Sequence, residues 1–350
     1  MCTARAMSWR ARLLTEFAPG ASPAYLLDMR DRPRNLAPLP QYAAKYLDLI
    51  ELSLTGSLLP PNARGECHPD RPLQLPRGKK ATDRVAGTCY VVNSGDFSVH
   101  RRLIGRDWPA LGVTMVGHAR LHNIRHCLEQ AVAAGVPGDF VELGVWRGGA
   151  SIYARAVLDV LGQRERSVRL FDAFGRIPGY GPATEFLAVT LQDVASNFET
   201  YGLEDGVVYH AGLFNETLPG FYHAHKGDPR SRIAVLRIDG NFYESYQDAL
   251  YHMWEFVPVG GFVIFDDYVE GKNAPWLGHF WAEFKRAHGL REQLRAIDWT
   301  SSFFQKVTDV QVDWTAYARD RARTQGRATK AVGTAGTVAG GRVTGKGSRQ

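Results

Sequence analysis

Short apolar runs alternate with longer amphipathic stretches through the middle of the chain. The runs cover residues 140–143, 168–171, 207–209, 233–238 and 262–265. The stretches between them that are predicted as helices cover residues 150–161, 191–201 and 246–256. Short runs that are apolar on both faces and separated by helices are typical of a parallel sheet with helices on each side. The pattern therefore predicts an α/β domain over residues 136–318, with a doubly wound, mostly parallel, Rossmann-like sheet.

Helices are also predicted before this pattern. Residues 41–54 are apolar enough for a helix, and a second, amphipathic helix ends at Gly135. The apolar positions of this second helix lie three or four apart: Leu121, Ile124, Leu128 and Val132. Residues 55–110 are rich in Pro, Gly, Arg and Asp and are predicted as loops. We therefore expect an N-terminal extension over residues 1–40 and a helical cap with variable loops over residues 41–135.

The end of the chain has a different character. Residues 281–288 are predicted as a helix, and residues 294–297 and 303–307 as an antiparallel pair of strands. Residues 319–350 are rich in Gly, Thr and Ala, have no helical or strand period, and are predicted to be a disordered basic tail. This tail carries six arginines, two lysines and one aspartate, which exceeds the net charge of +6 of the whole chain. Because the basicity belongs to the tail, we expect no nucleic-acid partner for the domain.

The composition gives little support to several other classes of protein. No run of about 18 apolar residues is present, so we expect no membrane partner and no membrane-spanning helix. Residues 1–17 lack the apolar region and the cleavage pattern of a targeting peptide, and we expect a cytoplasmic protein. No CxxC pair exists among the four cysteines, which favours reduced thiols: Cys2, Cys67, Cys89 and Cys127. The sequence leaves open whether the chain forms a homo-oligomer.

A glycine-rich loop, ELGVWRGG over residues 142–149, lies between the first predicted strand and its helix. It lacks the lysine of a Walker loop and the spacing of the GxGxxG dinucleotide fingerprint. Glu142 at its mouth would repel phosphate and suits an amino group. The spacing ExGxxxG, with Asp172 after the next strand, is typical of S-adenosylmethionine sites, where glycines admit the ligand and the acid accepts hydrogen bonds from the ribose. We interpret this rim of the sheet as a cofactor site.

A second group of acids indicates a metal. Asp239 follows the fourth predicted strand, and Asp266 and Asp267 follow the fifth. Carboxylates brought together by adjacent strand ends are costly unless a cation lies among them, and oxygen ligands favour Mg²⁺. Asp239 is also our candidate for the base that removes a proton from an acceptor hydroxyl. Three histidines are alternative candidates for the base: His210, His223 and His279.

With these motifs identified, the sequence resembles the macrocin O-methyltransferase family, whose members methylate sugar hydroxyls of macrolide antibiotics. The resemblance runs from about residue 46 to residue 306. It is carried by YLDLIELSLTG, GRDWPALGVTMVGHARLHNIRHCLE, GVPGDFVELGVWRGGAS, FDAFGRIP, AGLFNETLP, VLRIDGNFYES, GGFVIFDDY and IDWTSSFFQK. The resemblance implies a class I methyltransferase fold, the cofactors S-adenosylmethionine and Mg²⁺, and a small-molecule acceptor with a sugar-like or natural-product hydroxyl.

The resemblance also implies site residues. The implied metal ligands are Asp239, Asp266 and Asp267. The implied cofactor-binding residues are Thr114, Met115, Glu142, Gly144, Val145, Trp146, Arg147, Gly148, Asp172 and Gly212, the first two on a cap segment that closes over the cofactor. Three aromatic residues are candidates for an apolar acceptor pocket: Tyr243, Tyr268 and Trp276.

Two departures from the family pattern keep alternatives open. Asn241 stands where the family usually has a second aspartate, and the segment after FDAFGRIP is short, with Glu185 as its one acid before Asp193. Both departures would suit a non-catalytic or differently specific relative that keeps the fold, whereas the three clustered aspartates favour an active enzyme. An NAD- or nucleotide-sugar-dependent enzyme on a similar sheet is the other alternative, and it lacks the support of a GxGxxG motif.

Overall fold

A computed structural model describes most of the chain, over residues 33–59, 99–106, 111–178, 180, 182–268 and 275–323. Outside these ranges lie Cys2, Cys67, Cys89, residues 1–32 of the expected extension, residues 60–98 and 107–110 of the expected loops, and residues 324–350 of the expected tail. The fourth cysteine, Cys127, is a buried free thiol, and burial raises its pKa. No helix within the described ranges is long and apolar enough to cross a membrane.

Seven strands form one sheet, in the order β3-β2-β1-β4-β5-β7-β6. The five strands expected to be parallel are so: β1 (Asp139–Leu143), β2 (Val168–Asp172), β3 (Val207–Ala211), β4 (Ile233–Ile238) and β5 (Phe262–Phe265). β6 (Arg295–Ala296) and β7 (Ser302–Gln305) close the sheet as the expected antiparallel pair. The strand order reverses direction between β1 and β4, which is the point where doubly wound sheets bind ligands. The predicted fold class is confirmed.

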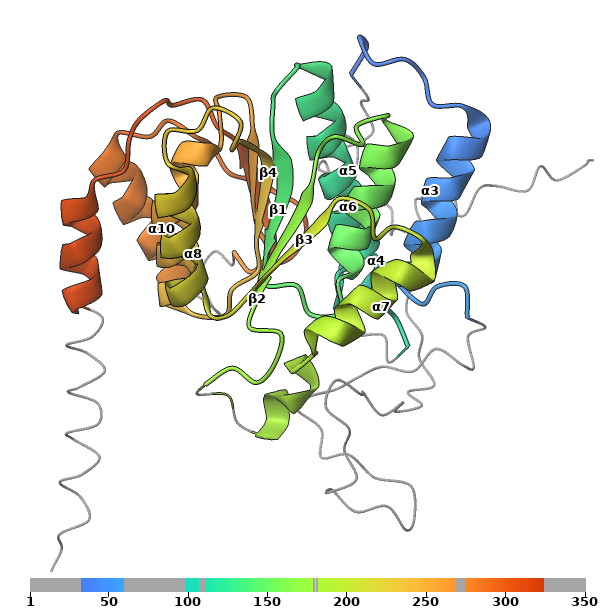
Figure 1. Cartoon of the computed structure of the whole chain (residues 1–350), viewed down its shortest axis with the longest axis horizontal. Helices are drawn as coiled ribbons and strands as arrows, with labels where there is room; N and C mark the ends of the chain where they lie inside the picture. The colour runs from blue at the N-terminus through green and yellow to red at the C-terminus, as the bar shows by residue number, and fades with distance from the viewer. Residues whose placement is uncertain are drawn as a thin grey trace, which may run out of the picture.

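Helices cover both faces of the sheet, as Figure 1 shows. One face carries α3 (Gln41–Leu54), α4 (Val99–Leu103), α5 (His118–Ala133), α6 (Gly149–Val160) and α7 (Leu191–Tyr201). The other face carries α8 (Phe214–His225), α9 (Tyr243–Met253) and α10 (Pro275–His288). The two helices of the expected cap, α3 and α5, pack against α6 in the same layer. Each layer therefore contributes one half of the hydrophobic core.

The central strand β4 has a sequence suited to this position. Its six residues, IAVLRI, are buried without exception, because helices cover both faces of the sheet. Aliphatic and β-branched residues dominate it, as is usual for a strand buried on both faces. The exception is Arg237, whose charge must be paired inside the protein. That pairing connects the fold to the site described below.

Several helices differ in extent from the sequence-based expectation. α8 was not expected, because Pro219 in the middle of it interrupts the helical pattern. Its first turn is stabilised by Glu216, whose Oε2 accepts a hydrogen bond from the Leu213 N–H at 3.2 Å. α9 and α10 begin three and six residues before the expected starts at 246 and 281. A long amphipathic stretch therefore predicts that a helix is present more accurately than it predicts the residue at which the helix begins.

A last helix covers residues 314–323 and passes the expected domain boundary at residue 318. It packs against α9, where the Tyr317 hydroxyl donates to Asp248 Oδ1 at 2.7 Å. Tyr243 of α9 donates in turn to Asp320 Oδ2 at 2.7 Å. The first residues of the expected tail, 319–323, are therefore helical and belong to the folded domain.

Candidate active site

A cavity of about 560 Å³ lies at the carboxyl ends of the parallel strands. Its walls are formed by the segments that follow β1, β2, β3, β4 and β5, together with residues near the start of α5 and from the β6–β7 connection. Six of the predicted cofactor-binding residues line it: Met115, Gly144, Val145, Trp146, Asp172 and Gly212. The predicted metal ligands line it as well: Asp239, Asp266 and Asp267. A volume of this size is ordinary for a small-molecule site, for which about 300–1,000 Å³ is typical.

The glycine-rich loop is shaped by close contacts within the sheet. Gly144 has a φ of +90°, and a Cβ atom there would lie 2.2 Å from the carbonyl oxygen of Asp239. Gly148 has a φ of +87° at the start of α6. Only glycine adopts such φ values readily. At both positions the backbone conformation alone requires glycine. At Gly144 the missing side chain also allows the end of β1 to lie close to the end of β4.

Asp172 at the end of β2 is held in one orientation by backbone donors. Its Oδ2 accepts the Val145 N–H at 2.7 Å, and its Oδ1 accepts the Phe174 N–H at 2.8 Å. Burial raises the pKa of Asp172, and these backbone hydrogen bonds oppose the increase. Each carboxylate oxygen can accept a further hydrogen bond. Asp172 can therefore receive two hydroxyl groups of a ligand without moving.

Trp146 forms a second fixed wall of the cavity. Its backbone has a φ of +49°, and its indole Nε1–H donates to the Phe186 carbonyl oxygen at 3.0 Å. The guanidinium of Arg147 lies 4.3 Å from the centre of the Trp146 ring and donates to the Gly112 carbonyl oxygen at 2.8 Å. Arg147 therefore supports the wall from behind and does not line the cavity.

Four of the predicted cofactor residues lie outside the cavity lining: Thr114, Glu142, Arg147 and Gly148. Thr114 is buried, and its Oγ1 accepts the Val116 N–H at 3.2 Å. Glu142 is 1% exposed, accepts a hydrogen bond from Ser151 and is paired with Arg237. The acid two residues before the first glycine is therefore a buried partner of an arginine.

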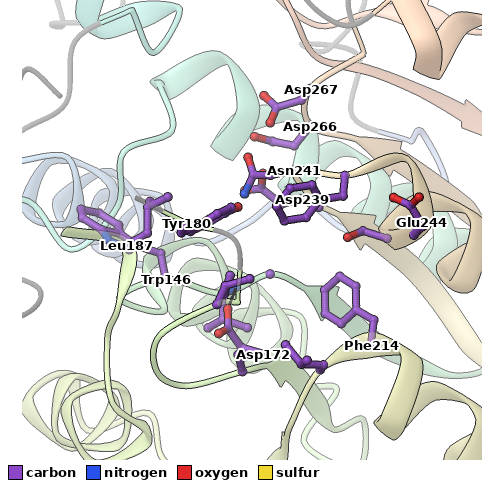
Figure 2. Close-up of a pocket in the computed structure, with 18 of the residues that line it drawn as sticks. Trp146, Asp172, Tyr180, Leu187, Phe214, Asp239, Asn241, Glu244, Asp266 and Asp267 are labelled. Carbon is purple, nitrogen blue, oxygen red and sulfur yellow. Dashed lines mark hydrogen bonds between the residues drawn. The ribbon is translucent and has the colours of Figure 1, made fainter. Parts of the chain in front are cut away.

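The three aspartates come together as the strand ends predicted. Asp239, Asp266 and Asp267 can each offer one carboxylate oxygen, and these oxygens lie within 4.8 Å of one another. Figure 2 shows the three side chains on one side of the cavity and Asp172 on the opposite side. Burial and the charge of Asp266 raise the pKa of Asp267 to about 6, and they also raise the pKa of Asp239 well above its usual value. A cation among the three groups would lower both pKa values.

Two buried arginines surround this cluster. Arg237 Nη2 lies 2.8 Å from Asp239 Oδ2 and 2.6 Å from Asp266 Oδ1. Arg120 of α5 contacts Asp266 and lies 2.7 Å from Asp298 Oδ2. These pairs hold the pKa of Asp266 below its usual value in spite of its burial.

The charge balance of the cluster fits a divalent cation. With Glu142 and Asp298 included, five carboxylates share two guanidinium groups, so negative charge is in excess. Carboxylate oxygens at this separation form a donor set that suits Mg²⁺ with water completing its coordination. Asp239, Asp266 and Asp267 would hold the ion.

The remaining candidates lie elsewhere. None of the three candidate histidines lines the cavity: His210, His223 and His279. His210 stacks on Phe171, and burial lowers its pKa to about 4, whereas His279 is exposed and pairs with Glu283. Tyr243 and Tyr268 do not line the cavity either, and the side chain of Trp276 lies outside the described part of the structure, as does that of Glu185.

Several cavity residues were missed from the sequence. They are Arg120, Tyr180, Phe214, Phe242, Glu244, Trp299 and Arg321. Five of them lie in segments that carry the family resemblance: Arg120 in GRDWPALGVTMVGHARLHNIRHCLE, Phe214 in AGLFNETLP, Phe242 and Glu244 in VLRIDGNFYES, and Trp299 in IDWTSSFFQK. Arg120 lies on a helix that was predicted, but the pattern of apolar positions does not show that its charged side chain lines the cavity.

Comparison with known proteins identifies the family of the chain. Residues 43–306 match the family described as Macrocin-O-methyltransferase (TylF). The chain is 40% identical over 274 residues to the 8-demethyl-8-(2,3-dimethoxy-alpha-L-rhamnosyl)-tetracenomycin-C 4'-O-methyltransferase of Streptomyces olivaceus, covering 74% of this chain and 92% of that one. It is 38% identical over 217 residues to the demethyldecarbamoylnovobiocin O-methyltransferase of Streptomyces niveus, covering 58% and 79%. The solved structure of the O-methyltransferase NovP matches with a TM-score of 0.60 and 33% identity, covering 76% of this chain and 100% of that one.

Proposed function

The chain belongs to the macrocin O-methyltransferase family and is an O-methyltransferase, and we propose that it methylates a hydroxyl group on a sugar carried by a natural product. We propose S-adenosylmethionine as the methyl donor and Mg²⁺ as the metal. The observation that carries the proposal is the arrangement of one cavity, with three convergent carboxylates on one side and Asp172 with the glycine-rich loop on the other. One side suits a cofactor and the other suits an acceptor hydroxyl.

The acceptor class rests on the relatives. One of them, 40% identical, is named for methylation at the 4' position of a rhamnosyl tetracenomycin derivative. Another, 36% identical over 231 residues, is the mycinamicin III 3''-O-methyltransferase of Micromonospora griseorubida. Both names describe a natural product as the acceptor, and the name of the first relative also includes the sugar, a rhamnosyl group. A glycoside of a natural product is therefore the acceptor that we propose for this chain.

The cofactor side of the cavity offers a fixed hydrogen-bond acceptor and close backbone. S-adenosylmethionine supplies an electrophilic methyl group on its sulfonium. In our proposal Asp172 accepts hydrogen bonds from the two ribose hydroxyls, because backbone donors already hold its orientation. Gly144 and Gly212, at the ends of β1 and β3, line the cavity and admit the ligand close to the main chain. Holding the methyl group in line with the acceptor oxygen supplies much of the rate enhancement.

The acceptor side offers charge. Bound Mg²⁺ would lower the pKa of an acceptor hydroxyl and orient it. In our proposal Asp239 accepts the hydroxyl proton, because it lies on the cavity wall while Arg237 holds its Oδ2 at 2.8 Å. Without a metal, burial and the charge of Asp266 raise the pKa of Asp239, and a bound cation would lower it again.

The experiment that tests the proposal is a titration followed by an assay. The protein is titrated calorimetrically with S-adenosylmethionine, first with Mg²⁺ and then with EDTA, and transfer of labelled methyl to rhamnosyl glycosides is measured. We expect cofactor binding in both titrations and transfer only with Mg²⁺. Cofactor binding without transfer to any glycoside would favour a non-catalytic relative, which Asn241 would suit. Binding of NAD with no binding of S-adenosylmethionine would overturn the proposal.

A further inference from the structure

Exposed aromatic side chains are concentrated at the cavity. Among the described residues, three aromatic side chains are highly exposed: Tyr42 at 76%, Trp299 at 43% and Phe242 at 39%. Phe242 and Trp299 both line the cavity, whereas Tyr42 lies on α3 and does not. Exposed aromatic surface is unfavourable in water, and a ligand that covers it gains binding free energy. Two such residues in the lining of one cavity indicate a ligand with apolar surface of its own.

We propose that the acceptor is a glycoside with a planar apolar aglycone, which packs on Tyr180, Phe242 and Trp299 while its sugar lies at the aspartate cluster. This inference rests on the proposed function and names the part of the acceptor that is not methylated. The three aromatic residues determine which glycosides bind, and the aspartates determine which hydroxyl reacts.

The Tyr180–Phe242 pair adjoins the aspartate cluster. Phe242 precedes α9 and follows Asp239 by three residues in the chain. The rings of Tyr180 and Phe242 lie 5.3 Å apart between their centres, with a tilt of 40°. The Tyr180 hydroxyl is hydrogen-bonded to the side chain of Asn241, beside which Figure 2 shows it. The pair therefore forms an apolar surface that lies close to the carboxylates.

Trp299 is held rigidly on another part of the wall. Its indole Nε1–H donates to the Ile104 carbonyl oxygen at 2.9 Å, and the Arg106 guanidinium lies 4.8 Å from the centre of its ring. The preceding residue, Asp298, is bound by Arg120, which also contacts Asp266. An aromatic ring fixed before binding loses little entropy when a ligand stacks on it. The ring is therefore suited to stacking, and Arg120 connects it to the cluster.

The test separates the sugar from the aglycone. The protein is loaded with S-adenosylhomocysteine and Mg²⁺ and titrated with methyl α-L-rhamnopyranoside or with 4-methylumbelliferyl α-L-rhamnopyranoside. Binding is read by calorimetry and, for the second probe, by quenching of umbelliferyl fluorescence, so no turnover is needed. The variants are Phe242→Leu and Trp299→Leu, with Tyr42→Leu as the matched control for loss of an exposed aromatic residue.

We expect the protein to bind the umbelliferyl glycoside at least about tenfold more tightly than the methyl glycoside. Phe242→Leu and Trp299→Leu should each reduce this ratio several-fold and leave the affinity for methyl rhamnoside unchanged, whereas Tyr42→Leu should leave the ratio as it is. Equal affinity for the two probes, no binding of either, or a ratio that the two variants do not change would overturn the inference. A loss of S-adenosylhomocysteine affinity in Trp299→Leu would also overturn it, because the ring would then serve the cofactor. Failure of the proposed function is distinguished by the cofactor titration of the unmodified protein.

Discussion

Arg237 of β4 and Glu142 of β1 form an ion pair inside the sheet, where each side chain is 1% exposed. The same guanidinium reaches Asp239 and Asp266 with its other nitrogen. Neither residue of the pair lines the cavity, but Arg237 holds two of the carboxylates that do. A buried charge without its partner is strongly unfavourable, so the pair links the stability of the sheet to the geometry of the site.

Replacing Glu142 tests this link. Glu142→Gln replaces one charged partner of Arg237 by a neutral hydrogen-bonding group while Asp239 and Asp266 remain, and we expect the free energy of unfolding to fall by about 1–3 kcal/mol. The matched control is Glu283→Gln, which removes one partner of the exposed Glu283–Arg323 pair and should change stability by less than about 1 kcal/mol. Urea unfolding of both variants measures the difference. Equal losses would show that the buried pair has no special weight.

Replacing Asp267 tests the metal site and leaves in place the ion pairs of Arg120 and Arg237 with Asp266. Asp267→Asn removes one carboxylate of the cluster, and we expect the affinity for Mn²⁺, used as a paramagnetic substitute for Mg²⁺, to fall at least about tenfold. The control is Glu244→Gln, an acid that lines the same cavity outside the cluster. Electron paramagnetic resonance of free Mn²⁺ gives both affinities. If the two variants lose affinity alike, the ion is attracted by the general charge of the cavity and is not held by the cluster.

The buried amine of Lys306 should make the stability of the protein rise with pH. Its Nζ donates to the Trp254 and Val257 carbonyl oxygens at 2.9 and 2.8 Å, and burial lowers its pKa to about 8. The unfolded chain therefore binds a proton that the folded chain lacks between pH 8 and about 10.4, and stability increases with pH in that window. The full effect is on the order of 3 kcal/mol.

The measurement is the difference in unfolding free energy between the protein and Lys306→Met from about pH 6 to pH 10. The difference should move in favour of the unmodified protein as the pH rises above 8. It should be constant below pH 7, where Lys306 is protonated in both states. A difference that does not depend on pH throughout would mean that the amine keeps its ordinary pKa in the folded protein.

The fold and the strand-end acids could be predicted because both are properties of local sequence. Apolar runs give the strands, and parallel strands bring their carboxyl ends to one edge, so Asp239, Asp266 and Asp267 were expected to meet. The role of Glu142 could not be predicted in this way. Its partner Arg237 lies in a run that reads as apolar, and only the pairing of β1 with β4 brings the two charges together. The exposure of Phe242 and Trp299 depends likewise on contacts between distant segments.

Glu51 of α3 is a second buried charge whose partners are distant in sequence. It is fully buried, and its carboxylate lies 2.6 Å from His118 Nδ1 and 3.0 Å from His122 Nε2, both on α5. Burial opposes its charge, but the two histidines outweigh burial and lower its pKa. We expect Glu51→Gln to weaken the packing of α3 on α5, with a loss of about 1–3 kcal/mol. Relative to the unmodified protein, the variant should show a larger increase of the hydrogen-exchange rate in α3 than in α9. An equal increase in both helices would contradict a local role of Glu51.

Gly144 tests whether the loop is shaped by the sheet or by a ligand. An alanine Cβ there would lie 2.2 Å from the Asp239 carbonyl oxygen at a φ of +90°, so Gly144→Ala must separate the ends of β1 and β4. Gly135→Ala is the matched control, because Gly135 has a φ of +66° but no atom within 4 Å of the added methyl group. The control should lose about 1–2 kcal/mol of stability from backbone strain alone. Gly144→Ala should lose about 1–3 kcal/mol more from overpacking, even without cofactor. Equal losses in urea unfolding of the two cofactor-free variants would mean that the contact with Asp239 relaxes freely, and that the glycine serves the ligand and not the sheet.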